Sequence, residues 1–270
     1  MSDTAAEAKS GLLRALRVIS LIAAEAPTTL GVSTIARELD LPKAVTHRIL
    51  KEFTGAGFLV FDEDTKQYRL GAGALTLGLA ALRSLDVPKV ARPHLERMVA
   101  RTGETATLSV RTGWVRVYID QVLSPHEIRM SVSLGTSHPL HAGSSSKVIL
   151  AHLSPNEIDQ YIAEHDLEAL TELTITSTTA LRKELGRIRE VGYAVSLGER
   201  QAGAGSVAAP IHRASSEIFG SISLCGPRDR FGADVLPRYA DLVVETAEAI
   251  SAELGYRSPR ALAPGRESHG

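Results

Sequence analysis

Apolar residues recur at helical spacing near the start of the chain. Intervals of four, three and four residues place one set on a single helical face: Leu12, Leu16, Ile19 and Ala23. Ser10 is a suitable N-cap for this helix, and Pro27 is a suitable stop. Two shorter helices are expected over 32–39 and 42–55, because an Asp-Leu-Pro turn interrupts the apolar pattern between them.

The pattern then changes to short runs that favour strands. Residues 58–61 and 68–70 predict a hairpin around a polar loop, and a mildly apolar helix follows over 74–85. A helix over 88–102 precedes runs of period two, interrupted by further helical patterns. The expected strands are 106–110, 115–122, 128–134, 193–197, 206–212 and 218–224, and the expected helices are 147–152, 156–164, 181–191 and 234–254. Strands in runs, without regular alternation with helices, predict an α+β fold with an antiparallel sheet.

The length of 270 residues suits two domains, each with its own core. We expect an N-terminal unit over 10–71, a linker helix over 72–86, a second domain over 87–257 and a flexible tail over 258–270. The exposed apolar surface expected for the linker helix, formed by Leu75, Leu77, Leu79 and Leu82, predicts a homodimer.

Composition excludes several classes of protein. The 44% hydrophobic and 23% charged residues are typical of a soluble globular chain. The net charge of -1 provides no broad basic field, so any binding of nucleic acid must be local. One cysteine excludes an internal disulfide and a Cys-rich metal site. We recognise no signal peptide and no membrane-spanning run, and therefore expect a cytoplasmic protein with no membrane partner.

The strongest chemical signal is a helix-turn-helix over 32–50. A second helix that follows a short turn can enter the major groove of B-DNA. Residues 41–54 carry a net charge of +2, where the groove would lie. We expect Lys43, Thr46, His47 and Lys51 to face the groove and Arg48 to contact phosphate. Ser33 at the start of the first helix and Lys66 and Arg69 in the hairpin complete the expected DNA-binding set; the alternative is a solvated amphipathic helix in a bundle.

Other motifs are less specific. Gly71-Ala-Gly73 and Gly203-Ala-Gly205 imitate part of a dinucleotide fingerprint but lack the strand-to-helix context. Gly143-Ser-Ser-Ser146 before a helix could hold an anion on free N–H groups or could simply cap the helix. No Gly-x-Ser-x-Gly elbow indicates a serine hydrolase.

Five further residues could carry chemistry. His138 and His141 have a spacing that could serve a metal, but no carboxylate or cysteine accompanies them, and a loop or pocket wall fits better. Cys225 could sense redox state or could be inert packing. Glu199-Arg200 could bind a polar ligand or form a surface ion pair. We expect no metal and no cofactor.

Together these runs resemble the IclR family of bacterial transcriptional regulators from about residue 10 to 256. The runs that carry this resemblance are Ala15–Ile22, Leu41–Leu50, Pro139–Lys147, Gly192–Ala194, Glu199 with Gly203, Ala208–Ile211 and Ser221–Pro227. The resemblance implies an N-terminal winged helix-turn-helix, a linker helix and a C-terminal GAF- or profilin-like effector-binding domain. It also implies a homodimer or a dimer of dimers (a homotetramer) that binds a palindromic operator. Such a regulator can act as a repressor.

The resemblance also implies an effector pocket. Ser144, Ser145, Ser223 and Cys225 correspond to pocket positions, with Ile128, Met130 and Leu140 as apolar walls and Leu197 at the border. This chain departs from the family in its Ala44-Val45-Thr46 run, in its more polar serine run at 144–146, and in Cys225, where many members have serine.

Two functions therefore remain at the level of sequence. The first is a ligand-responsive regulator that binds a double-stranded DNA operator and a small effector, expected to be an organic acid with a carboxylate. The alternative is a small-molecule-binding enzyme whose N-terminal helices serve oligomerisation. The helix-turn-helix favours the first, and the chain is expected not to be an enzyme.

Overall fold

The computed structural model describes residues 10–26, 28–83 and 87–257, without the side chains of 81–83. Pro27, the side chain of Leu82, residues 84–86 of the expected linker and the expected tail 258–270 lie outside the described residues. The chain divides into two compact units, 1–85 and 86–270, and each is described by itself.

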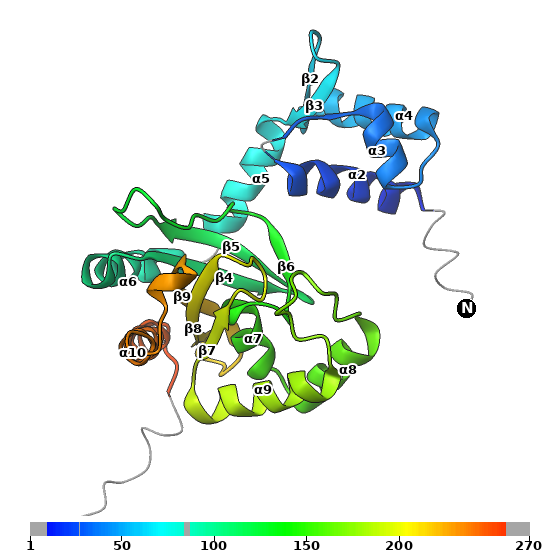
Figure 1. Cartoon of the computed structure of the whole chain (residues 1–270). Helices are drawn as coiled ribbons and strands as arrows, with labels where there is room; N and C mark the ends of the chain where they lie inside the picture. The colour runs from blue at the N-terminus through cyan, green and yellow to red at the C-terminus, as the bar shows by residue number, and fades with distance from the viewer. Residues whose placement is uncertain (1–9, 27, 84–86, 258–270) are drawn as a thin grey trace, which may run out of the picture. The chain divides into compact units, whose positions relative to one another are not determined.

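The first unit combines helices with a small antiparallel sheet of order β1-β3-β2. Its described elements are α2 (Gly11–Glu25), β1 (Leu30–Gly31), α3 (Val32–Glu38), α4 (Lys43–Gly55), β2 (Leu59–Asp62), β3 (Gln67–Leu70) and α5 (Ala72–Arg83). One cluster of buried side chains joins α2, α3, α4 and the hairpin: Val18, Ile22, Ile35, Ile49, Leu50, Leu59 and Tyr68. The first unit is therefore a helix-turn-helix with a β2–β3 wing, as predicted (Figure 1).

The apolar face of the first helix formed by Leu12, Leu16, Ile19 and Ala23 is not the buried one. In α2 the buried residues are Val18 and Ile22, whereas Leu12 and Leu16 are 73% and 51% exposed. Apolar side chains occur on both sides of this helix, so spacing alone could not decide which side packs. The core formed by α3 and α4 selects the stripe that contains Val18 and leaves Leu12 and Leu16 in contact with solvent.

The second unit is built on a six-stranded antiparallel sheet of order β6-β5-β4-β9-β8-β7. Its helices are α6 (Val87–Thr102), α7 (Ser144–Ala151), α8 (Pro155–Glu164), α9 (Thr178–Val191), η1 (Arg228–Arg230) and α10 (Leu236–Glu253). Its strands are β4 (Thr105–Thr112), β5 (Val115–Val122), β6 (Ser137–Pro139), β7 (Ala194–Leu197), β8 (Ala204–His212) and β9 (Ile218–Pro227). Among the described helices of the chain, none has both the length and the apolar character needed to cross a membrane.

The strand expected over 128–134 does not form. This segment is irregular, and β6 instead provides the edge strand. The Gln121 side chain donates to the Val132 carbonyl at 2.8 Å and accepts from the Val132 N–H at 3.0 Å, while Thr105 donates to the Met130 carbonyl at 2.7 Å. Side chains therefore satisfy backbone groups that a strand would pair in a ladder.

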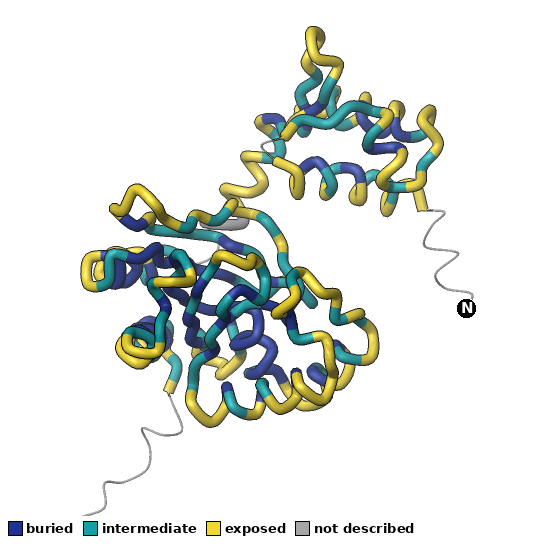
Figure 2. The backbone as a smooth tube through the Cα atoms, in the orientation of Figure 1, coloured by how far each residue is buried: buried dark blue, intermediate teal, exposed yellow. Residues whose placement is uncertain are grey.

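Both faces of the large sheet are covered. Helices α6 and α10 lie on one face and α7 on the other, with α8 and α9 outside α7 (Figure 1). Consecutive residues of β8 and β9 are consequently buried irrespective of their parity, as the dark blue centre of Figure 2 shows. The sheet face that is covered by α7 carries polar side chains of β5, β7, β8 and β9.

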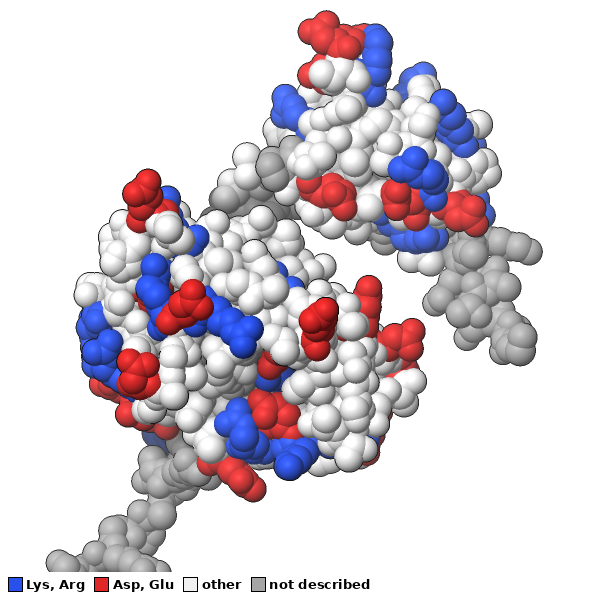
Figure 3. Space-filling view, viewed as in Figure 1, with Lys and Arg blue, Asp and Glu red and all other residues white. Residues whose placement is uncertain are grey.

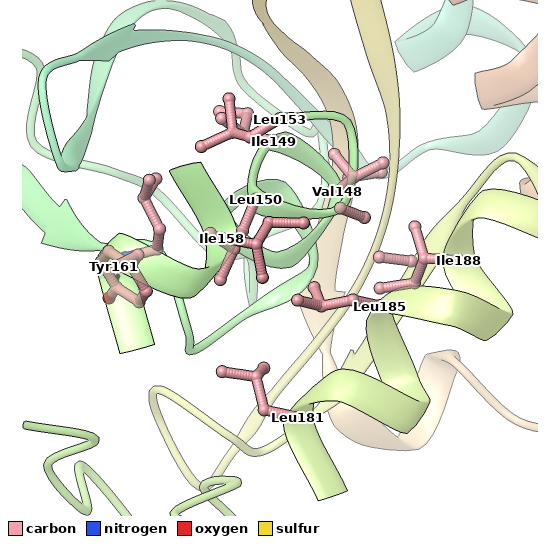
Figure 4. Close-up of a cluster of buried hydrophobic side chains, with 13 residues drawn as sticks. Val148, Ile149, Leu150, Leu153, Ile158, Tyr161, Leu181, Leu185 and Ile188 are labelled. Carbon is pink, nitrogen blue, oxygen red and sulfur yellow. Dashed lines mark hydrogen bonds between the residues drawn. The ribbon is translucent and has the colours of Figure 1, made fainter. Parts of the chain in front are cut away.

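The outer helices pack around α7 in a single apolar cluster (Figure 4). Helix α9 contributes Leu181, Leu185 and Ile188, each at most 3% exposed. The other labelled members are Val148, Ile149, Leu150, Leu153, Ile158 and Tyr161. This cluster buries residues 148–151 of α7, while the first turn of the helix is buried beyond it, against the sheet.

We predict that Gly220→Ala strongly destabilises the second unit. A Cβ at Gly220 would lie 1.9 Å from the Ser109 carbonyl oxygen of the neighbouring β4 strand. Because the oxygen that the Cβ meets belongs to the backbone of β4 and cannot rotate away, the strands must separate, and the cost should reach about 2 kcal/mol or more. Gly186→Ala is the control: it lies within α9, where a Cβ meets nothing within 4 Å, and should stabilise by about 0.5–1 kcal/mol. Thermal unfolding measures both; an unchanged melting temperature for Gly220→Ala would contradict the strand packing.

Candidate functional site

Helix α4 presents basic and polar side chains on one exposed face. Ile49 and Leu50 pack inward, and the turn before α4 is closed by Asp40, which has a left-handed φ of 50°, and by the Leu41 N–H, which donates to the Ala36 carbonyl. Lys43, His47, Arg48 and Lys51 are all exposed. Among the described residues, none of these four side chains forms an ion pair or hydrogen bond, so they are available for a ligand.

Thr46 does not belong to this face. It is fully buried, and its hydroxyl donates to the Pro42 carbonyl at 3.3 Å. Positions 46, 49 and 50 follow the i, i+3, i+4 spacing of one helical face, so Thr46 shares the inward side with Ile49 and Leu50. The prediction that Thr46 faces the groove is therefore corrected.

The other residues expected to bind DNA lie on α3 and the hairpin. Ser33 is exposed in the first turn of α3, and Lys66 and Arg69 are exposed on the wing. Lys66 lies 3.4 Å from the Glu63 carboxylate and 5.9 Å from the centroid of the Phe61 ring. Acidic and basic side chains both gather at the tip of this hairpin (Figure 3). The positive charge of the wing is thus partly offset, in contrast to that of α4.

In the second unit a pocket opens between the first turn of α7 and the sheet. It is lined by Arg116, Tyr118, Met130, Val132, Gly143, Ser144, Ser145, Ser196, Arg200, Gln201, Ala204, Ser206, Ser223 and Cys225. The lining includes five of the residues expected there: Met130, Ser144, Ser145, Ser223 and Cys225. The two serine positions and the β9 strand therefore converge although they are far apart in sequence.

Three expected pocket residues lie elsewhere. The Ile128 side chain is exposed to solvent, with 75% of the residue accessible. The Ile128 carbonyl accepts a hydrogen bond from Arg230 at 3.1 Å. Leu140 is fully buried in the α7–α9 cluster. Leu197 belongs to β7, but neighbouring strand residues point to opposite faces, and Ser196 is the one that lines the pocket. These three positions are corrected.

Hydroxyl groups hold the first turn of α7 against the sheet. Ser144 donates to the Ser206 hydroxyl at 2.7 Å, and Ser221 donates to the Ser145 carbonyl at 3.3 Å. Arg116 donates from Nε to the Ser146 hydroxyl at 2.9 Å. Gly143, with φ of +89°, is the N-cap and provides no side chain to the helix start, so the first N–H groups of α7 face the pocket without a side-chain cap.

A buried lysine anchors the same turn from behind. Lys147 is 1% exposed and its Nζ donates to Glu184 at 3.0 Å, to the Val195 carbonyl at 3.0 Å and to Glu199 at 2.5 Å. The other oxygen of Glu199 accepts from the Gly143 N–H at 3.1 Å. Glu199 therefore forms a buried ion pair with Lys147. The sequence had left open whether Glu199-Arg200 binds a polar ligand or forms an ion pair at the surface. Arg200, the next residue, lines the pocket.

Arg116 is the most unusual side chain of the pocket. It is 1% exposed, its Nη1 donates to the Ser109 hydroxyl at 2.9 Å, and its guanidinium lies 3.9 Å from the centroid of the Tyr118 ring. The guanidinium of Arg200 lies 6.0 Å from the same centroid. Burial lowers the pKa of Arg116, and the nearby Arg200 charge lowers it further, but a guanidinium remains protonated in proteins.

His138 and Cys225 are neutral beside these arginines. Burial, followed by the charges of Arg116 and Arg200, lowers the pKa of His138 to about 3. Burial raises the pKa of the Cys225 thiol to about 12, so the reactive thiolate is scarce at neutral pH. His141 points elsewhere, between the Tyr161 hydroxyl and the Glu168 carbonyl. Within the described residues, no group of three or more His, Cys, Asp or Glu could hold a metal ion.

Sequence reasoning left the role of Arg200 open and missed Arg116 in the pocket. The run at 115–122 alternates between apolar Val115, Val117 and Ile119 and polar residues that include Arg116. In an isolated strand, the polar face would be read as the solvent face. The signal was present, because a charged residue and Tyr118 share that face, but only the position of α7 shows that the face is covered.

The chain resembles known proteins over both units. Residues 11–63 match the family model of the IclR helix-turn-helix domain, and residues 79–252 match that of the bacterial transcriptional regulator IclR C-terminal domain. The HTH-type transcriptional regulator BhcR of Paracoccus denitrificans is 34% identical over 238 residues, 88% of this chain and 85% of that protein. The HTH-type transcriptional repressor AllR of Escherichia coli K12 is 32% identical over 228 residues, 84% of each chain.

A solved structure supports the same assignment. An IclR homolog from Microbacterium hydrocarbonoxydans, crystallised in complex with 4-hydroxybenzoate, superimposes with a TM-score of 0.75 at 26% identity. The match covers 91% of this chain and 99% of that chain.

Proposed function

The chain belongs to the IclR family of bacterial transcriptional regulators, and we propose that α4 binds the major groove of its operator while the pocket of the second unit binds a small organic acid. The regulator has the helix-turn-helix and the effector-binding domain of this family. We place its action in the cytoplasm.

The proposed DNA contacts rest on the exposed face of α4. Lys43, His47 and Lys51 follow one another at intervals of four residues on the exposed surface of α4, and this row is suited to reach base edges. Arg48, also exposed on α4, is assigned a phosphate contact. Ser33, Lys66 and Arg69 are proposed to contact the backbone at the edges of the site. Thr46 is left out because it is buried.

We predict that Arg48→Ala weakens binding to all duplexes alike. Loss of one phosphate contact should lower the slope of log affinity against log salt by about one. Thr46→Val is the matched control, because a buried side chain of the same shape should leave the preferred operator unchanged. Fluorescence anisotropy across a salt series, with a selection from randomised operators, measures both effects. A changed base preference in Thr46→Val would mean that this hydroxyl reads a base.

One observation carries the proposed effector. The pocket combines two arginines, a helix start with free N–H groups and several hydroxyls, a set that matches the oxygens of a carboxylate. Met130 and Val132 provide an apolar wall for the remainder of the molecule. The homolog crystallised with 4-hydroxybenzoate is consistent with an acid of this kind. The matches to regulator families and to the repressor AllR favour a regulator over the alternative of an enzyme.

We predict that Ser145→Leu abolishes the response to the effector while DNA binding is retained. Ser145 lines the pocket in the first turn of α7, so a larger apolar side chain should fill the site and exclude the acid. Ser215→Leu, on an exposed turn, is the control. Calorimetry with a panel of small organic acids that includes 4-hydroxybenzoate measures binding, and circular dichroism verifies the fold. Parent-like affinity of Ser145→Leu for an acid that binds the parent chain would place the pocket elsewhere.

The oligomeric state is proposed from exposed apolar side chains. Leu75, Leu77 and Leu79 of α5 are 63%, 60% and 46% exposed, which is excessive for a solitary helix. We propose that α5 pairs with a second copy, so that two α4 helices read a palindromic operator, and that two such dimers can associate.

We predict that the double substitution Leu75→Glu with Leu79→Glu converts the dimer to a monomer. Charged groups cannot be buried in an apolar interface without partners, so association should weaken by at least about tenfold. Val191→Glu, at an exposed position of α9, should remain a dimer. Sedimentation equilibrium distinguishes these states. A parent chain that is strictly monomeric at micromolar concentration, with and without operator, would contradict the model.

A further inference from the structure

The pocket carries positive charge that the chain does not neutralise. Its lining contains Arg116 and Arg200, and no Asp or Glu among the described residues. The nearest acids are already engaged: Glu199 binds Lys147 and the Gly143 N–H, and the buried Glu104 receives two hydrogen bonds from Arg230 at 2.6 and 2.9 Å. The counter-charge must therefore come from outside the described chain.

Arg116 is the fixed member of this pair. Its hydrogen bonds end on the neutral hydroxyls of Ser109 and Ser146, and one face of its guanidinium stacks on Tyr118. A buried cation that has only neutral partners is costly, and its environment improves when an anion enters. Because β4, β5 and α7 each hold one side of this guanidinium, its position is defined before a ligand arrives.

Arg200 is the second and more accessible member. It follows Glu199 in the β7–β8 loop, and among the described residues it makes no ion pair. Both guanidiniums lie against the Tyr118 ring, so their charges repel one another. A ligand with one negative charge leaves one of these two cations without a counter-charge, and the positive end of α7 adds to the excess.

We propose that the effector is a small dianion of the dicarboxylate class, with one anionic group on Arg116 at the floor of the pocket and the other on Arg200. This inference rests on the proposed function of the pocket as a site for an organic acid. Arg116 and the start of α7 can bind a single carboxylate without Arg200. Arg200 is therefore the residue that selects ligands with a second negative charge.

The test compares acids that differ only in the second charge. Malonate, succinate, fumarate and glutarate are each titrated against their monoamides, at constant ionic strength, with calorimetry on the full chain. The parent should bind at least one dicarboxylate about tenfold or more tightly than its monoamide, the effect expected of one charge-assisted contact. Arg200→Gln should lose this preference and keep its affinity for the monoamide, whereas Arg200→Lys should restore part of it.

Two further variants separate charge recognition from folding. Arg116→Met should lose affinity for both members of each pair. Arg213→Gln, which removes an arginine that stacks on Phe219 outside the pocket, should behave as the parent. Equal or better binding of the monoamides, or an unchanged preference in Arg200→Gln, would overturn the dianion while leaving the organic-acid site intact. If no acid of either series binds, the dianion proposal is overturned; if the wider acid panel also fails, the proposed function of the pocket fails with it.

Discussion

The burial of the first turn of α7 is the constraint on which the second unit depends. All eight residues of α7 are buried, including three serines and a lysine that would prefer water. Each polar group therefore needs a partner, and the sheet, α9 and the β7–β8 loop supply them through Ser206, Arg116, Glu184 and Glu199. These bonds place the N-terminus of α7 over the sheet and so create the pocket.

The same arrangement separates apolar packing from ligand chemistry on one face of the sheet. The end of α7 packs with α8 and α9 in the cluster of Figure 4, whereas its beginning faces serine, arginine and tyrosine side chains. Alternation along β5, β7, β8 and β9 brings these polar residues to one side. A pocket thus forms where the apolar cluster ends.

Each unit contains a local group of basic side chains. The chain as a whole is nearly neutral at -1, yet α4 exposes four basic or imidazole side chains, and the pocket holds two arginines without a lining acid among the described residues. Both places offer cations whose counter-charge is absent from the surrounding protein. Such places attract anions, which is the basis of the proposed phosphate contacts of α4 and of the proposed organic acid in the pocket.

Local pattern alone was sufficient for the helix-turn-helix, the wing, the α+β class and most strands, because helix and strand periodicity depend on neighbouring residues. The resemblance carried by the sequence also located Ser144, Ser145, Ser223 and Cys225 in one pocket. Only the tertiary structure decided which face of α2 is buried, that Thr46 points inward, and that the backbone of Val132 bonds to the side chain of Gln121 rather than to the backbone of a strand. It also decided that Arg116 faces a pocket, since the polar face of a strand looks the same in sequence whether water or another element covers it.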